Sequence, residues 1–322
     1  MAVTALNWKK LATVTLAGSA INQLLDGIYT ALGATTYYDG STRTPGSGSA
    51  WTVARYQNAG TTEAVYAVPP TGALAHKVIF GGAAGAKTPT MASPDTWLAS
   101  CVLVGLAKNA GAYNAWDNAA PFTSGQFYGY WRLTSQTTVV RVTVYEAEEC
   151  LLVRYETSAN IGNMCIIGAL WDPGSVAATA AESDGRRYGV AVTNNTGITS
   201  NFHESVQHWL GHSPTVSQAH TMVAGVGAVS TFTACVRNSL VGAGLSSTTS
   251  LTNAAGEALG IPIYHQYNTA APNDLFVGVL RNVYIIKNSV SEAVRQTSAG
   301  VAVWYCTGYS TAASGNCVGL EV

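Results

Sequence analysis

The sequence predicts a mainly β protein, either an antiparallel β-sandwich or a jelly-roll-like fold, with one short helix near the N-terminus. Many short segments with strand-like patterns are separated by turns rich in Gly, Asn and Ser, which is typical of antiparallel sandwiches and barrels. Only one stretch has the apolar spacing of a helix. Regular alternation of strands and helices is missing from the pattern, and so is a repeat of solenoid or propeller length.

The predicted helix spans residues 19–33. Apolar residues recur there at positions i, i+3, i+4, i+7 and i+11 and form one face: Ile21, Leu24, Leu25, Ile28 and Leu32. Ser19 is placed to act as the N-cap, and Gly33 to follow the last turn as a C′ glycine. Gly27 weakens the interior by about 1 kcal/mol relative to alanine. The helix therefore needs a surface to pack against, on a partner or on the β region.

Turns and strands follow this helix. Residues 35–48 are rich in Gly, Ser, Thr and Pro, and Asp39-Gly40 and Pro45-Gly46 are turn signals. Beyond the hairpin described next, strands are expected at residues 51–54, 64–68, 77–80, 101–107, 164–171, 187–192, 231–236, 261–267, 275–280, 283–286, 301–306 and 318–322. The strand at 164–171 is continuously apolar, which predicts burial on both faces.

Residues 138–157 have the clearest β pattern. Apolar positions alternate with polar ones along both arms: Val140, Val142, Val144, Leu151, Val153 and Tyr155. The pattern predicts an antiparallel hairpin with one buried face. Glu146, Glu148 and Glu149 fall in its connection. Catalytic carboxylates would need to face each other across a cleft, so a solvated tip is the simpler interpretation.

We divide the chain into three parts. Residues 1–48 form an N-terminal helix and loop arm, and residues 49–172 form a β-sandwich region. Residues 173–322 form a second β region or a continuation of the same domain. The border is placed where residues 173–184 become small and polar. A chain of 322 residues suits one large β domain or two smaller ones.

The composition is poor in charge. Charged residues make up 10% of the chain and hydrophobic residues 48%, whereas globular proteins average about 25% charged residues. This balance indicates large buried or contact surfaces. The net charge is −1 and the basic residues are scattered, so no nucleic-acid partner is expected. We expect no membrane insertion and no secretory leader, hence synthesis in a cytoplasm.

No coherent set of catalytic or ligand residues stands out, so we expect no enzyme activity, cofactor or metal. Four histidines lie close together in the sequence: His203, His208, His212 and His220. His208 and His212 have the i, i+4 spacing that would place two metal ligands on one face of a helix, but the glutamate of the zinc-binding HExxH motif is missing. Gly211 and Pro214 also oppose a helix there. Loop or interface histidines are the expected interpretation.

An aromatic contact surface is the better functional candidate. Its members lie in a segment rich in Asn, Gly and Ser: Tyr113, Trp116, Phe122, Phe127 and Tyr128. Tyrosine and tryptophan suit stacking on sugars or a protein interface. Packing within the core of a large sandwich is the alternative.

The chain has six cysteines and no CxxC pair, which argues against a zinc ribbon or a redox motif. Residues 301–306 and 316–322 are expected to pair as a C-terminal hairpin. Cys306 and Cys317 would then lie opposite or nearly opposite each other, close to the reach of a disulfide. Free thiols in a core and a bond to a neighbouring subunit remain alternatives.

The Ala/Gly/Ser/Thr-rich β pattern, the short N-terminal helix and the C-terminal hairpin resemble virion structural proteins of tailed bacteriophages. The segments YYDGSTRTPGSGSAWT at 37–52 and NAWDNAAPFTSGQF at 114–127 share that character. The resemblance transfers no functional residue. It implies a head-surface, neck or tail component, made in the host cytoplasm, that contacts other virion proteins and further copies of itself. A tail adhesin for a host carbohydrate or receptor and a secreted glycan-active enzyme are the alternatives.

Overall fold

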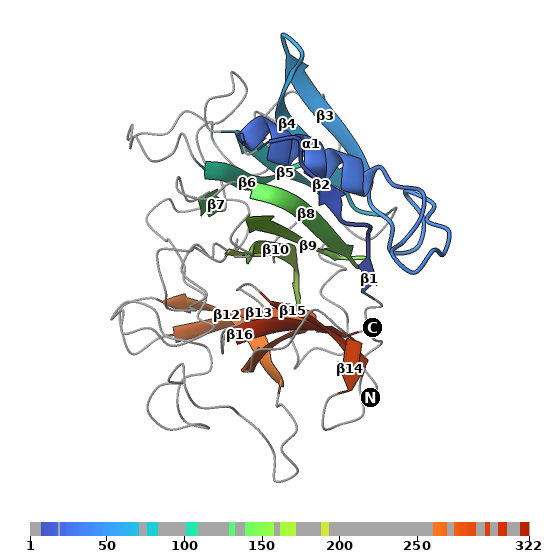
Figure 1. Ribbon diagram of the computed structural model, residues 1–322. Coiled ribbons are helices and arrows are strands. Elements are labelled where there is room, and N and C mark those ends of the chain that lie inside the picture. The colour runs from blue at the N-terminus through green and yellow to red at the C-terminus, as the bar shows by residue number, and fades with distance from the viewer. Residues whose placement is uncertain are drawn as a thin grey trace.

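The computed structural model describes residues 8–18, 20–70, 76–82, 101–108, 129–132, 139–157, 162–171, 188–192, 260–268, 274–287, 294–296, 302–307 and 316–321. These residues form antiparallel β-sheets and one short helix (Figure 1). The prediction of a mainly β, antiparallel fold with a short N-terminal helix is therefore confirmed.

The described residues up to Trp171 supply the helix and ten strands. They are β1 (Lys9–Lys10), β2 (Val14–Thr15), α1 (Ile21–Leu32), β3 (Thr52–Asn58), β4 (Thr61–Val68), β5 (His76–Gly82), β6 (Cys101–Lys108), β7 (Gly129–Arg132), β8 (Val139–Glu146), β9 (Cys150–Thr157) and β10 (Gly162–Trp171). The described residues after Trp171 supply β11 (Tyr188–Val192), β12 (Gly260–Asn268), β13 (Asp274–Lys287), β14 (Val294–Gln296), β15 (Ala302–Thr307) and β16 (Asn316–Glu321).

Two sheets contain these strands. The smaller has the order β3-β4-β5-β6-β7. The larger runs β1-β8-β9-β10-β13-β16-β15-β14, and β2, β11 and β12 pair with β8, β10 and β13. At the end of β10, Leu170 and Trp171 pair with Leu280 and Val279. Strands β12 to β16 then form a layer of their own beyond β8 to β10 (Figure 1).

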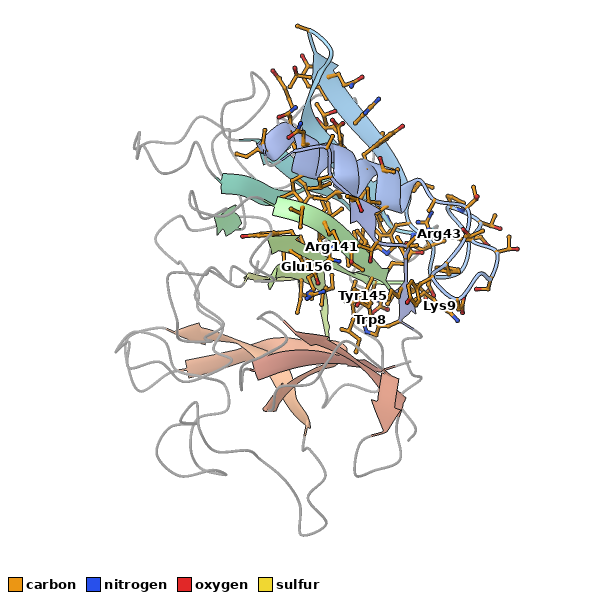
Figure 2. All side chains as sticks on the ribbon, viewed as in Figure 1. Trp8, Lys9, Arg43, Arg141, Tyr145 and Glu156 are labelled. Atoms are coloured by element: carbon orange, nitrogen blue, oxygen red, sulfur yellow. The ribbon has the colours of Figure 1, made fainter. Side chains whose placement is uncertain are left out.

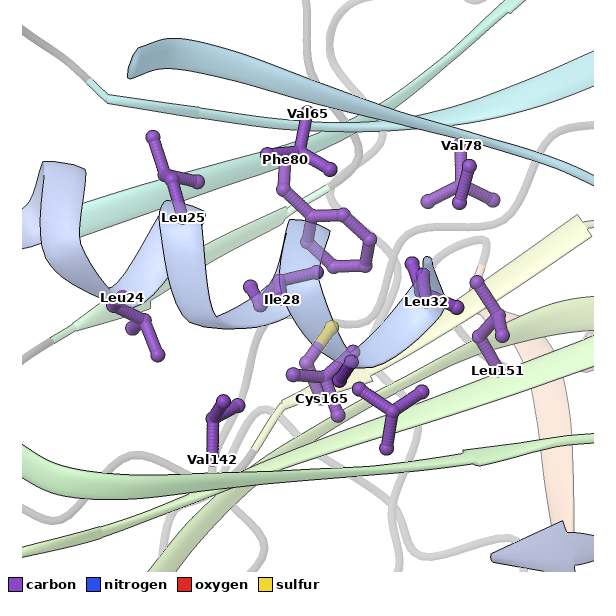
Figure 3. Packing of buried hydrophobic residues seen from close by; sticks show 14 of the residues in the cluster. Leu24, Leu25, Ile28, Leu32, Val65, Val78, Phe80, Val142, Leu151 and Cys165 are labelled. Atoms are coloured by element: carbon purple, nitrogen blue, oxygen red, sulfur yellow. The ribbon is translucent and has the colours of Figure 1, made fainter. Parts of the chain in front are cut away.

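Helix α1 lies between the smaller sheet and strands β8 and β9. Figure 3 shows Leu25 on the side of Val65 and Phe80, and Leu24 on the side of Val142. All five residues are fully buried. The apolar face of the helix therefore packs on this chain's own β region, between two sheets.

The helix ends differ from the predicted caps. The helix begins at Ile21 with Ala20 as N-cap, and the Ala20 N–H donates to Gln23 Oε1 at 3.0 Å; Ser19 lies outside the described residues. Gly33 is the C-cap, with a right-handed φ of −82°. A left-handed glycine is not needed here, because Arg43 binds the free carbonyl oxygen of Leu32 at 2.7 Å.

The predicted hairpin is present, but most of its second face is also buried, so the expected solvent face is wrong except at the exposed Arg141. Thr143, Tyr145, Leu152 and Arg154 are at most 3% exposed, although they alternate with the inner valines. The layer of β12 to β16 lies on that side of the sheet (Figure 1). Alternation along a strand shows that two faces differ, but not that one of them meets water.

The later strands also agree with the sequence, with one correction. The expected strands at 275–280 and 283–286 are a single strand, β13, which pairs with β12 and β16 along most of its length. The register with β12 shifts between Tyr284 and Val279, so the polar residues Arg281 and Asn282 lie at an irregularity within β13 rather than in a turn between two strands. The expected strand at 231–236 lies outside the described residues.

The connection between α1 and β3, residues 33–51, is called the strap below. It turns at Gly40 and Gly46, whose φ values of +83° and +82° require glycine-like freedom. The segment expected as an N-terminal arm, residues 1–48, thus contributes strands β1 and β2, the helix and most of the strap. The proposed border at 173–184 lies outside the described residues. Within the described part, no helix has the length and apolar character needed to cross a membrane.

Candidate functional site

The most connected polar group among the described residues centres on Arg43 of the strap and Glu146, the last residue of β8. Both side chains are fully buried. Arg43 Nε donates to Glu146 Oε1 at 2.7 Å, and Nη2 donates to Oε2 at 2.8 Å. Such a bidentate pair fixes the orientation of both groups and strengthens their hydrogen bonds.

The other donors of Arg43 bind main-chain oxygens. Nη1 donates to the carbonyls of Leu32 and Ala34 at 2.7 and 2.8 Å, and Nη2 donates to that of Trp51 at 2.6 Å. A guanidinium has five N–H donors, and all of them are used here. One side chain therefore ties together the end of α1, both ends of the strap and the β8–β9 hairpin.

Like Arg43, the Glu146 carboxylate is extensively hydrogen-bonded. Its Oε2 also accepts the main-chain N–H of Trp51 at 3.0 Å, and the Tyr37 hydroxyl hydrogen-bonds to the same carboxylate. Burial, followed by the negative charge and hydrogen bond of Glu146, raises the pKa of Tyr37 to about 12. The indole N–H of Trp51 donates to the Ala147 carbonyl at 2.6 Å. These contacts leave the carboxylate bound on both oxygens.

This environment defines what the pair can do. A general acid or base must reach a proton on its substrate, but Glu146 is 0% exposed and already hydrogen-bonded. We therefore regard Arg43 and Glu146 as a structural clamp. The expectation of a solvated tip is wrong for Glu146 and Glu149, which are 0% and 4% exposed; Glu148 is exposed.

Two further ionic groups also join separate segments. Glu156 of β9 forms an ion pair with Arg141 of β8 at 2.7 Å, which links the two strands (Figure 2), and a second with the nearly buried Arg154 of its own strand at 2.6 Å. Asp26 of α1 accepts from Arg55 of β3 at 3.0 Å and from Thr62 of β4 at 2.5 Å. The charges that the structure describes in these groups serve to connect elements.

The exposed end of the strap is the best-defined contact surface among the described residues. Tyr38 is 59% exposed, and the Lys10 ammonium lies 4.3 Å from the centre of its ring. The adjacent Asp39 accepts the main-chain N–H of Ser41 at 2.9 Å and its hydroxyl at 2.6 Å, and these hydrogen bonds lower the pKa of Asp39. The tip thus presents a tyrosine and a carboxylate in a fixed arrangement.

Several predicted residues cannot be compared with this geometry. The aromatic surface of Tyr113, Trp116, Phe122, Phe127 and Tyr128 lies outside the described residues, and so do the histidines between 203 and 220. Among the described residues, no group of His, Cys, Asp and Glu is arranged to hold a metal ion. Of the cysteines, Cys150 and Cys165 are buried, and burial raises the pKa of the Cys165 thiol.

The C-terminal hairpin is formed by β15 and β16. Its register places Cys306 opposite Val318 and Cys317 opposite Thr307. The two cysteines are offset by one position rather than directly opposed. A disulfide between them stays a prediction.

The sequence contained a weak signal for the clamp. Arg43 is a lone charge within a run of Gly, Ser, Thr and Pro, in a chain with only 10% charged residues. A charge in such a place calls for a partner, but its partner is 103 residues away. The pairing of β8 with β1 and the course of the strap bring the two together, and neither follows from local pattern.

Comparison with known proteins adds no family to this description. No protein-family model matches the chain, and no curated protein matches it.

Proposed function

We propose that this protein is a structural component of a tailed-bacteriophage virion, at the head surface, neck or tail, and not an enzyme. One observation carries the proposal: a chain with 10% charged and 48% hydrophobic residues is built into stacked antiparallel sheets. Such a composition suits a protein whose surface is partly covered by neighbours. The neighbours would be other virion proteins and further copies of this chain, and no cofactor is involved.

The described ionic groups support a scaffolding role. Arg43, Arg55 and Arg141 each form an ion pair with a carboxylate on a different segment of the molecule. The exposed Tyr38 at the tip of the strap is the kind of residue that anchors protein interfaces.

Mapping the protein in intact particles tests the proposal. Particles are purified on a density gradient from cells that express the chain with an epitope tag, and are then labelled with gold-conjugated antibody. We expect the tag to co-purify with particles and to label one defined position. A tagged protein that stays in the soluble fraction while complete particles form would contradict the proposal.

The second candidate is a tail adhesin that binds a host carbohydrate, and the exposed Tyr38–Asp39 tip of the strap favours it. An aromatic ring can stack on a sugar while a carboxylate accepts hydrogen bonds from its hydroxyls. A glycan array with the parent chain and the Tyr38→Ala variant separates the two functions. Specific binding that the variant loses would support the adhesin. Turnover of an arrayed glycan would instead indicate a glycan-active enzyme.

A further inference from the structure

The strap covers the edge of the larger sheet. In the described part of the chain, β1 is the end strand of this sheet and pairs with β8 on one side. On its other side lies the strap: the Tyr38 N–H donates to the Lys10 carbonyl at 2.9 Å, and Tyr37 forms a β-bridge with Leu11. An uncovered edge strand is a template for pairing with another chain.

Little besides the clamp holds the strap in place. Between residues 33 and 49, Arg43 is the one buried residue, and the others are exposed or partly exposed. Between its ends, the strap's apolar contact with the core is Tyr37, which is only partly buried. Its attachment depends on the hydrogen bonds of Arg43, on the Tyr37 hydroxyl at Glu146 and on the contact of Lys10 with Tyr38.

The core beneath the strap is held by other contacts. Leu24, Leu25, Val142, Val144 and Val153 are fully buried between the sheets, and none of them belongs to the strap. A segment with few buried apolar contacts can open locally while the core stays folded.

We propose that the strap is a latched cover. Arg43 and Glu146 form the latch, and the closed strap keeps the β1 edge from pairing with a strand of a second copy of this chain. The closed strap and an added strand would compete for the main-chain carbonyl of Lys10, which now accepts the Tyr38 N–H. The inference does not depend on the proposed virion role.

Hydrogen exchange followed by mass spectrometry tests the latch in the full-length chain. In the Arg43→Met variant we expect peptides of the strap to exchange roughly tenfold faster or more, because several charge-assisted hydrogen bonds are lost. Peptides of β8 and β9 should keep the protection of the parent chain. Light scattering should show species larger than the parent chain forms at the same concentration.

Two further variants separate the latch from general destabilisation. Arg43→Met/Glu146→Leu leaves no buried charge without its partner, yet it should expose the strap as the single variant does. Arg55→Met removes an ion pair whose side chains are 34% and 42% exposed. This variant should change neither the hydrogen exchange of the strap peptides nor the size measured by light scattering.

If Arg43→Met unfolds the whole protein, hydrogen exchange of the parent chain at low denaturant concentration tests the latch instead. The strap amides of Tyr38 and Arg43, which donate to main-chain carbonyls, should then open at lower free energy than the amides of β8 and β9. If the strap amides exchange only through global unfolding, with the same opening free energy as the amides of β8 and β9, the proposal is overturned. It is also overturned if the strap opens in the latch variants without any added association.

Discussion

Gly27 decides how closely α1 approaches the larger sheet. A Cβ at this position would collide with Leu16 Cδ2 and would lie 2.8 Å from Val142 Cγ1. Leu16 is partly exposed and can move, but Val142 is fully buried in β8 and has a stiff χ1 angle. The sequence shows only the loss of helix propensity; the contact explains why glycine is present.

We expect Gly27→Ala to destabilise the protein by about 1 kcal/mol, although alanine favours helices. Overpacking costs about 1–3 kcal/mol, and the gain in helix propensity offsets about 1 kcal/mol of it. Urea denaturation measures the change. Thr30→Ala, at an exposed position of the same helix, should be neutral or stabilising. If Gly27→Ala in a Val142→Ala background costs as much as in the parent chain, the collision with Val142 is not the cause.

Tyr37 makes the stability of the protein depend on pH in the alkaline range. Its pKa is raised from 10.0 to about 12 in the folded protein, so the fold favours the neutral phenol. The contribution of Tyr37 is fully present below pH 10.0 and is lost as the pH rises towards 12. We expect Tyr37→Phe to lose less stability than the parent chain between these pH values, by denaturant titration at each pH. If both proteins lose the same amount of stability over this pH range, Tyr37 is not the group responsible.

At the scale of elements, the β3–β4 hairpin closes through a strained turn. Asn58 pairs with Thr61, and the two residues between them, Ala59 and Gly60, have φ values of +47° and +80°. Positive φ at both positions is the signature of a type I′ turn, which favours Asn-Gly. Alanine at the first position costs about 1 kcal/mol in strain.

We expect Ala59→Asn to stabilise the protein by about 0.5–1 kcal/mol, because asparagine tolerates the left-handed conformation. Ala59→Val should have the opposite sign, since a β-branched side chain is disfavoured there. Thermal unfolding of the three proteins measures both effects. Equal melting temperatures of the valine and asparagine variants would show that the turn does not hold this conformation in solution.

The C-terminal hairpin carries the sequence-based prediction of a disulfide. With Cys306 and Cys317 one position out of register, direct opposition needs a one-residue slip of β15 against β16, and such a slip moves every side chain to the other face. Peptide mapping of non-reduced, alkylated protein decides the question. A linked peptide with both cysteines would support the bond, and alkylation of both in the unreduced protein would contradict it.

On the scale of the whole molecule, α1 is shared by two sheets. Its buried residues belong to one core with residues of β4, β5, β8 and β9 (Figure 3). The sequence alone left open whether the helix packs on a partner or on its own β region. The core settles this in favour of the β region.

We expect deletion of residues 1–33 to abolish the native packing rather than to remove an accessory arm. The deletion takes away the helix between the sheets and the strands β1 and β2 that pair with β8. Near-ultraviolet circular dichroism should lose its fine structure, and dye binding should report exposed apolar surface. A truncated protein that keeps the native spectrum and the solubility of the parent chain would contradict this expectation.

The sequence by itself determined the elements that depend on neighbouring residues. The apolar period of residues 21–32, the alternation at 139–157 and the glycine turns of the strap are local, and the structure has each of them. Their boundaries shifted by a few residues, because pairing with a neighbouring strand extends a strand beyond its apolar part. The mainly β class followed from the same local patterns.

Only the tertiary structure decided which faces are buried and which charges meet. Strand β8 is covered on both sides, and Arg43 finds Glu146 across 103 residues of sequence. Burial of the second face depends on the layer that the chain folds over it, and the clamp depends on where the strap crosses β1. Both are long-range consequences of sheet order, and a residue's immediate neighbours in the sequence contain no record of that order.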